Sequence, residues 1–143
     1  MYRVRQQDLP FQGSSHQFVG AEHGEVGISV YLLSALPGRG PGPHRHPYDE
    51  VQFVRSGRGL YTVEGVEFEA GAGDILVLKA GEIHAFRCIG EELLVQLDVH
   101  LSPRFIQENL SEEAARAVRR WPAAGDRPAA AGAPEPPAGR REP

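Results

Sequence analysis

The stretch that decides the fold reads Pro43-His44-Arg45-His46-Pro47-Tyr48-Asp49-Glu50. Residues two apart in a β-strand point to the same face, so His44 and His46 project side by side with their Cα atoms about 6–7 Å apart. Pro47 and Asp49 favour a turn, and a bend there can bring the Glu50 carboxylate to the two imidazoles. Two nitrogens and one oxygen form a ligand set that Fe(II) favours, and Mn, Ni, Zn or Cu can also accept it.

A fourth ligand is expected further along the chain, because a site assembled from one short stretch would hold a divalent ion weakly. His84 is the candidate, since it follows the apolar run 75–78 and the turn residue Gly81. A single histidine is more often an ordinary core or surface residue, but four ligand side chains at these spacings favour a metal site. We therefore predict one divalent transition metal, held by His44, His46, Glu50 and His84.

These residues resemble the two sequence motifs of the cupin superfamily, Gly-x5-His-x-His-x3-Glu-x6-Gly and Gly-x5-Pro-x-Gly-x2-His-x3-Asn. The first motif is matched at every position, by Gly38, His44, His46, Glu50 and Gly57. The second motif is matched at Gly73, Gly81 and His84. Lys79 stands where proline is usual and Cys88 where asparagine is usual, and neither departure removes a ligand. We expect Lys79 on a solvated turn and Cys88 as a small buried hydrophobe.

The resemblance covers residues 25–101 and implies a small single-domain cupin, an all-β, double-stranded β-helix of the jelly-roll barrel type. Apolar runs that recur about every eight to twelve residues also favour an all-β barrel or sandwich. Around the barrel we expect an irregular N-terminal arm at 1–24, a short C-terminal helical segment at 102–121, and a disordered Ala/Pro/Gly-rich tail at 122–143.

The helical segment is predicted to contain two short helices outside the barrel. A Ser-Pro pair at 102–103 is typical of an N-cap and a first helical residue, which predicts a helix over 104–110. Ser111 is expected to cap a second helix that runs to Trp121.

The barrel strands are predicted from runs of β-branched and apolar residues, at 26–36, 51–54, 59–63, 66–69, 74–78, 84–89 and 93–101. The strand at 74–78 is expected to be buried, and a two-residue hairpin turn is expected at Glu64-Gly65. One face of the last strand is apolar and consists of Leu93, Val95, Leu97, Val99 and Leu101.

The opposite face of the last strand carries Gln96, Asp98 and His100. Such a polar face is usually solvated, but in a small barrel it can instead line the open mouth of the cavity. Gln52 lies two residues after Glu50, and Phe86 lies two residues after His84, so both share the ligands' strand faces and should look into the cavity. The possible pocket lining therefore consists of Gln52, Phe86, Gln96, Asp98 and His100.

Charge and composition argue against some classes of partner and location. A net charge of −4 with scattered arginines offers no basic patch, so we expect no nucleic-acid partner. Cys88 is the single cysteine, which excludes an internal disulfide and favours a reducing, cytoplasmic compartment. The N-terminus lacks an apolar signal region, and the longest uncharged stretch, 26–38, is too short to span a bilayer.

The resemblance also implies a homodimer, because small cupins often lay an N-terminal strand against a partner's sheet. The arm at 1–24 can equally be a frayed terminus.

Three histidines and one glutamate fill four positions of an octahedron and leave two open, enough for an organic ligand beside O2 or water. By resemblance, small cupins include dioxygenases, isomerases, lyases and non-catalytic binding domains, and the motifs do not choose among them. We expect a metal-binding protein that acts on a small organic molecule, as a dioxygenase-like enzyme, an isomerase or a lyase. The alternative is a non-catalytic small-molecule binding or sensor domain, and a purely structural role would predict a packed cavity without metal.

Overall fold

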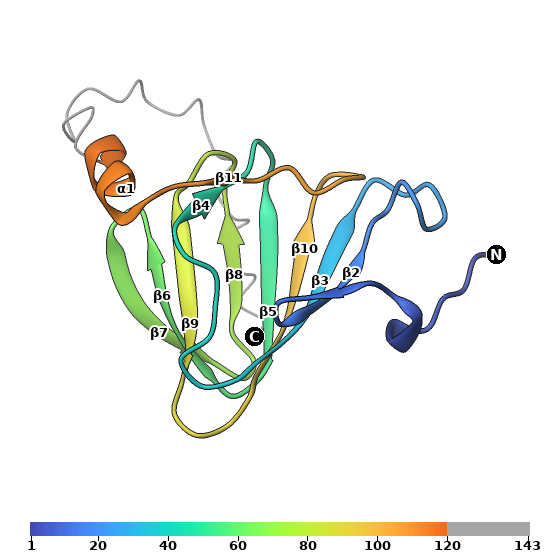
Figure 1. The fold of residues 1–143 in the computed structure, drawn as a ribbon, viewed down its shortest axis with the longest axis horizontal. Helices are drawn as coiled ribbons and strands as arrows, with labels where there is room; N and C mark the ends of the chain where they lie inside the picture. Colours follow the sequence, from blue (N-terminus) through green and yellow to red (C-terminus); the bar gives the residue numbers. More distant parts are fainter. Residues whose placement is uncertain (120–143) are drawn as a thin grey trace, which may run out of the picture.

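Two antiparallel sheets face each other in the computed structural model, which describes residues 1–119 (Figure 1). The larger sheet has the strand order β1 (Phe11–Gln12), β2 (Ser15–Phe18), β3 (Ser29–Ala35), β10 (Leu94–His100), β5 (Glu50–Ser56) and β8 (Ile75–Leu78). The smaller sheet has the order β11 (Glu108–Asn109), β4 (His44–Arg45), β9 (His84–Ile89), β6 (Arg58–Val63) and β7 (Val66–Gly71). The predicted all-β double-stranded β-helix is confirmed.

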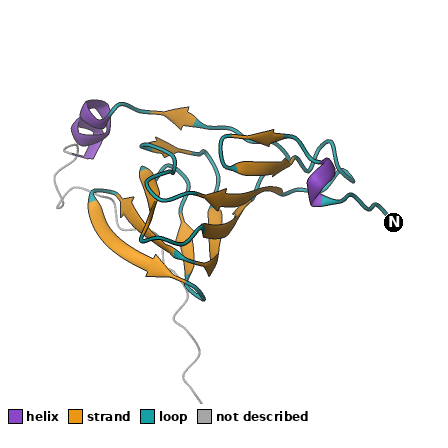
Figure 2. Cartoon of the chain, turned by 60° about the horizontal axis from the view of Figure 1, so that its bottom comes forward, coloured by secondary structure: helices purple, strands orange, loops and turns teal. Residues whose placement is uncertain are grey.

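Two helical elements accompany the sheets, the 3-10 helix η1 (Gln6–Asp8) and the α-helix α1 (Glu112–Arg119). They lie outside the barrel and at opposite ends of the molecule (Figure 2). Within residues 1–119, no helix combines the length and the apolar character needed to cross a membrane.

Glycine is required at two positions, one in a hairpin turn and one where two backbone segments lie close together. Glu64 and Gly65 connect β6 to β7 with φ angles of 47° and 83°, the left-handed pair that a type I′ hairpin turn requires. Gly40 lies in the Pro/Gly-rich segment before β4, where an added Cβ atom would lie 2.0 Å from the carbonyl oxygen of Phe86. This segment therefore runs close against β9, and the backbone N–H of Cys88 donates to the carbonyl of Arg39 at 2.8 Å.

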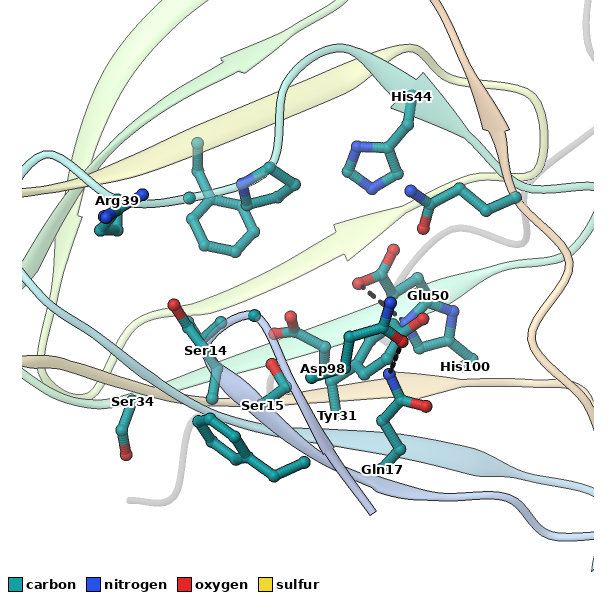
Figure 3. A pocket seen from close by; sticks show the side chains of 18 of the residues that line it. Ser14, Ser15, Gln17, Tyr31, Ser34, Arg39, His44, Glu50, Asp98 and His100 are labelled. Atoms are coloured by element: carbon teal, nitrogen blue, oxygen red, sulfur yellow. Dashed lines mark hydrogen bonds and ion pairs between the residues drawn. The ribbon is translucent and has the colours of Figure 1, made fainter.

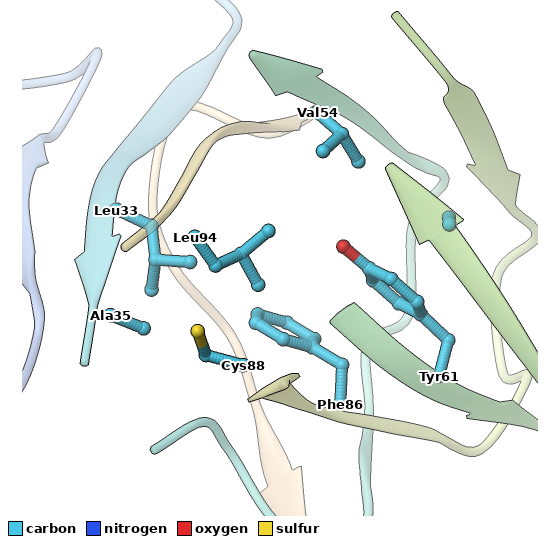
Figure 4. Packing of buried hydrophobic residues seen from close by; sticks show 8 residues of the cluster. Leu33, Ala35, Val54, Tyr61, Phe86, Cys88 and Leu94 are labelled. Atoms are coloured by element: carbon cyan, nitrogen blue, oxygen red, sulfur yellow. The ribbon is translucent and has the colours of Figure 1, made fainter. Parts of the chain in front are cut away.

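The barrel interior changes from polar at one end to apolar at the other. Three strands share this gradient, and their buried inward residues are Glu50, Gln52 and Val54 on β5, His84, Phe86 and Cys88 on β9, and His100, Asp98, Gln96 and Leu94 on β10. The apolar end forms a core of Leu33, Ala35, Val54, Tyr61, Ala70, Phe86, Cys88 and Leu94 (Figure 4). Cys88 is thus a buried member of the core, as predicted.

The two faces of β10 are arranged with the polar side chains inward. The polar residues of this strand are buried, whereas Leu97 and Val99 on the apolar face are partly exposed. Leu97 lies across from Leu32 of β3 and Phe53 of β5, so a row of apolar side chains crosses the outer surface of the larger sheet. Of the two alternatives for the polar face, the structure therefore supports the one in which it belongs to the barrel interior.

The strand predicted at 74–78 exists as β8, but the prediction that it is buried was wrong. Ile75 and Val77 are 59% and 60% exposed, and only Leu78 is fully buried. Ile75 and Val77 lie beside Phe53 and Val51 of β5 on the outer face of the larger sheet, and among the described residues β8 is an edge strand that pairs only with β5. Its apolar composition resembles that of a central strand, and sequence alone does not distinguish the two.

The helix predicted over 104–110 does not form. The Ser102 hydroxyl donates to the carbonyl of Arg104 at 2.7 Å, which closes a local turn in place of a helix cap. The chain then runs extended into β11, which pairs with β4. The second predicted helix begins as expected, because Ser111 Oγ accepts a hydrogen bond from the backbone N–H of Ala114 at 3.0 Å.

The C-terminal predictions are only partly covered by the structure. The described part of α1 ends at Arg119, and the predicted helix end at Trp121 and the predicted disordered tail at 122–143 lie outside the described residues.

The N-terminal arm is more regular than predicted, because 1–24 contains η1, β1 and β2. Strand β2 pairs with β3 of the same chain, from Ser15 opposite Leu33 to Phe18 opposite Val30. The arm therefore extends the larger sheet of its own barrel, and the homodimer stays a prediction.

Candidate metal site

All four predicted ligand residues meet at the polar end of the barrel. His44 lies on β4, His46 just after it, Glu50 at the start of β5 and His84 at the start of β9. Each is buried, and one ligand atom from each lies within 4.8 Å of the others. The local alternation of β-structure aims the first pair inward, and the β4–β9 pairing places His84 directly opposite His44.

Each of the three histidines hydrogen-bonds a backbone carbonyl through Nδ1. His44 Nδ1 donates to Gly42 O at 2.8 Å, His46 Nδ1 to Ile106 O at 2.8 Å, and His84 Nδ1 to Glu82 O at 2.9 Å. A carbonyl oxygen only accepts, so Nδ1 carries the hydrogen, and in a neutral ring Nε2 is left with a free lone pair. This outer contact fixes both the tautomer and the direction of each imidazole.

Two of these free nitrogens, those of His46 and His84, converge on one oxygen of Glu50. His46 Nε2 lies 3.3 Å and His84 Nε2 lies 3.1 Å from Glu50 Oε2, and within residues 1–119 these three buried atoms have no hydrogen-bond partner. The lone pairs on these nitrogens are repelled by the negative charge of the carboxylate. A cation bound between the nitrogens and the carboxylate oxygen would give each of these atoms a partner. The donor set of three imidazoles and one carboxylate therefore fits a transition-metal ion, which would bind to atoms that are otherwise unsatisfied.

Burial determines the protonation state of His44. The pKa of His44 is lowered to about 4, first by burial and then by the neighbouring His84, which keeps its imidazole neutral. His44 thus offers a neutral imidazole, which is the form that a metal ion binds.

A cavity of about 760 Å³ adjoins the cluster, and it has one apolar and one polar side. Apolar side chains along it include those of Leu33, Leu36, Pro41 and Phe86. Figure 3 shows His44, Glu50 and His100 at one end of the cavity, and Arg39, Ser14 and Ser34 at the other. A volume of this size suits a small organic molecule.

The predicted pocket-lining residues fall into two groups. Phe86, Asp98 and His100 line the cavity itself. Gln52 and Gln96 are buried beside it, where Gln52 Nε2 donates to Glu50 Oε1 at 3.0 Å and Gln96 Nε2 donates to Asp98 Oδ1 at 2.6 Å. Gln52 and Gln96 therefore orient two carboxyl groups.

Asp98 has an unusual environment for a carboxyl group. Burial raises its pKa well above the ordinary value, and the nearby Glu50 carboxylate raises it further, while the hydrogen bond from Gln96 lowers it. The net shift favours the neutral acid, which can donate a hydrogen bond as well as accept one.

Two contributors to the site were missed by the sequence prediction. Tyr48 Oη lies 3.0 Å from His100 Nδ1 and accepts a hydrogen bond from the backbone N–H of Ile106 at 3.1 Å. Tyr48 lies in the bend between β4 and β5, so the alternation of strand faces gives no signal for it. The N-terminal arm also lines the cavity, through Ser15 and Gln17, and no local signal indicates the long-range pairing that brings it there.

Sequence similarity connects this chain to a known protein family and to a bacterial protein. The family model described as "Cupin domain" matches residues 31–100. An uncharacterized protein of Streptomyces coelicolor is 35% identical over 83 residues, which cover 58% of this chain and 75% of that protein.

Among solved structures, oxalate decarboxylase from Bacillus subtilis, described with Mn(II) centres, is 25% identical with a TM-score of 0.62 over 71% of this chain. The match covers only 29% of the oxalate decarboxylase chain. A Klebsiella pneumoniae protein with a double-stranded β-helix domain is 21% identical with a TM-score of 0.57, and the match covers 78% of this chain and 92% of that one.

Proposed function

This chain belongs to the cupin family, and on that premise we propose that it holds one divalent transition-metal ion and acts on a small organic molecule. The ion would be held by His44, His46, Glu50 and His84, beside the cavity of about 760 Å³. Such an ion, when bound, supplies Lewis-acid or redox chemistry to an oxygen-containing ligand.

One observation carries the proposal. His46 and His84 bond their Nδ1 hydrogens to backbone carbonyls, and their Nε2 atoms, unpartnered among the described residues, face the unpartnered Oε2 of Glu50. The Nδ1 of His44 is held in the same way. A cluster evolved only for packing would leave buried polar atoms unsatisfied at a cost of about 1–3 kcal/mol each. A bound cation removes that cost.

The metal identity is part of the proposal. Fe(II) suits this mixed nitrogen and oxygen set, and Mn(II) accepts the same ligands. The similarity to a cupin domain of oxalate decarboxylase, a protein described with Mn(II) centres, supports manganese as the second candidate.

The side chains that line the cavity favour binding of a molecule with an apolar body and a polar end. Phe86 and Leu33 offer apolar contact, while Asp98 and His100 offer polar groups near the cluster. Burial of the cluster excludes bulk water, which strengthens electrostatic contacts to a bound ligand. We propose a dioxygenase-like, isomerase-like or lyase reaction as the outcome of such binding.

Elemental analysis of the natively purified protein, joined to a turnover screen, tests the proposal. We expect one transition-metal ion per chain. Oxygen consumption would be followed with thiols, catechols, flavonols and diketones, and gas release or product formation with small carboxylic acids. Bound metal with turnover supports an enzyme, bound metal with ligand binding alone supports a sensor, and a metal-free protein that does not take up any of these ions contradicts the proposal.

A further inference from the structure

We infer that His100 is not a fifth metal ligand but a hydrogen-bond donor that binds an oxygen atom of the cavity ligand, which the donor's chemistry identifies as a carboxylate. The inference rests on the proposed function, because it places this carboxylate beside the proposed metal ion. It assigns a role to a fourth histidine that lies outside both sequence motifs.

The position of His100 separates it from the ligand cluster. His100 is the last residue of β10 and is 1% exposed. It pairs with Glu50 on the neighbouring strand β5. It lines the cavity, yet it does not belong to the group of four residues whose ligand atoms lie within 4.8 Å of one another. Its Nε2 atom approaches Glu50 Oε1 at 3.5 Å, on the opposite oxygen from the one that faces His46 and His84.

Tyr48 determines which nitrogen of His100 carries a hydrogen. The Tyr48 oxygen already accepts from the backbone N–H of Ile106, and its own hydrogen needs an acceptor. His46 Nδ1, at 3.5 Å, already donates to the carbonyl of Ile106, so the acceptor is His100 Nδ1 at 3.0 Å. The hydrogen of a neutral His100 ring therefore sits on Nε2, the reverse of the tautomer found in the three ligand histidines.

Glu50 gives a second, independent reason for the same assignment. A lone pair on His100 Nε2 would face the Oε1 atom of a carboxylate, whereas an N–H there is attracted to it. A doubly protonated His100 ring would also carry a hydrogen on Nε2. The assignment of a donor therefore holds in either charge state.

The donor is fixed in direction and lacks a partner. The ring of His100 meets Tyr31 edge-on at 5.1 Å and Phe105 edge-on at 5.0 Å, which prevents the ring from turning over. His100 Nε2 has no hydrogen-bond partner among the described residues, because 3.5 Å to Glu50 is too long for a normal bond. A buried donor without a partner is destabilising, and an oxygen of a cavity ligand would satisfy it.

The chemistry of this donor selects the class of ligand. An N–H group in a water-poor cavity binds a negatively charged oxygen more strongly than a neutral one. Asp98, two residues earlier on the same strand face, adds a carboxyl group that can donate when neutral. A small carboxylate can place one oxygen at His100 while it remains beside the metal site.

Nuclear magnetic resonance of the zinc-loaded, full-length protein tests the tautomer directly. Long-range ¹H–¹⁵N correlation distinguishes histidines that carry the hydrogen on Nδ1 from those that carry it on Nε2. We expect Nδ1–H for His44, His46 and His84 and Nε2–H for His100, and we expect Tyr48→Phe to weaken the Nε2–H preference. An Nδ1–H form of His100, or a metal-bound His100, would overturn the inference.

Ligand binding to the cobalt-loaded protein tests the donor role, with acetate as the probe and the visible spectrum as the readout. His100→Leu should weaken acetate binding about tenfold or more, and His100→Gln, which keeps a donor, should restore part of it. Imidazole, which reaches the ion without an oxygen acceptor, should bind both variants like the parent. Equal acetate affinity in the parent and His100→Leu would overturn the inference.

Metal stoichiometry separates this inference from the proposed function. Both His100 variants should retain one ion per chain, and loss of the ion in both would make His100 a ligand and overturn the inference. A parent protein that takes up no metal would overturn the proposed function, while the tautomer measurement on the metal-free chain would still decide the assignment of His100.

Discussion

His44 and His84 are direct cross-strand partners between β4 and β9, although they come from two separate sequence motifs. Their imidazole centroids lie 4.2 Å apart, and each Nδ1 donates to the carbonyl two residues earlier in its own chain segment. The two histidines are thus oriented by the same local device. His46 differs, because its Nδ1 depends on the carbonyl of Ile106, which is remote in sequence.

The first prediction concerns metal content. Loss of a residue that only hydrogen-bonds a metal ligand lowers metal affinity by about 10–100-fold. His46→Ala should lower it further, because this change removes a nitrogen ligand itself. Elemental analysis after dialysis measures the change. His23→Ala is the matched control, since His23 lies outside the cluster and pairs with Tyr2. Equal metal content in His46→Ala and the parent would refute the four-residue assignment.

The second prediction concerns Tyr48, which links the histidines to the segment before β11. Tyr48→Phe removes the acceptor of the Ile106 N–H, and loss of this hydrogen bond should lower the free energy of unfolding by about 0.5–1.5 kcal/mol. The carbonyl that orients His46 belongs to the same residue, so metal affinity should also fall, by up to about tenfold.

Chemical denaturation and metal titration measure the two effects of Tyr48→Phe. Tyr2→Phe serves as the control, because the Tyr2 hydroxyl also bonds a histidine, His23, but on the exposed N-terminal arm. Equal losses in the two variants would show that the position of Tyr48 in the site has no special importance.

The third prediction concerns acid stability of the metal-free protein. Burial, as the largest cause, lowers the pKa of both His44 and His100 to about 4, whereas an unfolded histidine titrates near 6.5. Between these values the unfolded chain binds protons that the folded chain does not. Stability should therefore fall as the pH drops from about 6.5 toward 4, by up to about 1.4 kcal/mol per pH unit for each group.

Urea unfolding at several pH values between 7 and 5 measures this slope. His100→Gln removes the contribution of His100, so its slope should be smaller than that of the parent by up to about 1.4 kcal/mol per pH unit. Equal slopes in the parent and His100→Gln would show that His100 is not held neutral by burial.

The fourth prediction concerns Lys79, which stands where the family usually has proline. Lys79 is exposed, as predicted, and it forms an ion pair with Asp49, while its backbone N–H donates to Glu82 Oε2 at 2.7 Å. Proline has no N–H, so Lys79→Pro should lower the melting temperature more than Lys79→Ala, which loses only the exposed ion pair. Calorimetry of both variants makes the comparison, and a more stable Lys79→Pro variant would contradict it.

The sequence by itself determined the strands and the ligand residues, because both depend on local geometry. Residues two apart share a strand face, so His44 and His46 must project together wherever that strand lies. The Glu64-Gly65 hairpin is equally local, since its φ angles suit only a short list of residues.

Only the tertiary structure decided which faces are buried. The alternating pattern of β10 is the same whether the polar or the apolar side chains point inward, and the facing sheet places Asp98 and His100 inside. Ile75 and Val77 are exposed because they lie on the outer face of β8, whose second edge pairs with no strand in the described part of the chain. The helix predicted over 104–110 is replaced by strand β11, because the long-range pairing of residues 108 and 109 with β4 outweighs the local helix-start signal.

The contact between Tyr48 and His100 was also decided by the tertiary structure, because the pairing of β5 with β10 brings the two residues together. Local patterns specify the direction in which a side chain leaves its strand. What that side chain meets depends on contacts between segments far apart in sequence, and the free energy of those contacts is not encoded in any one segment.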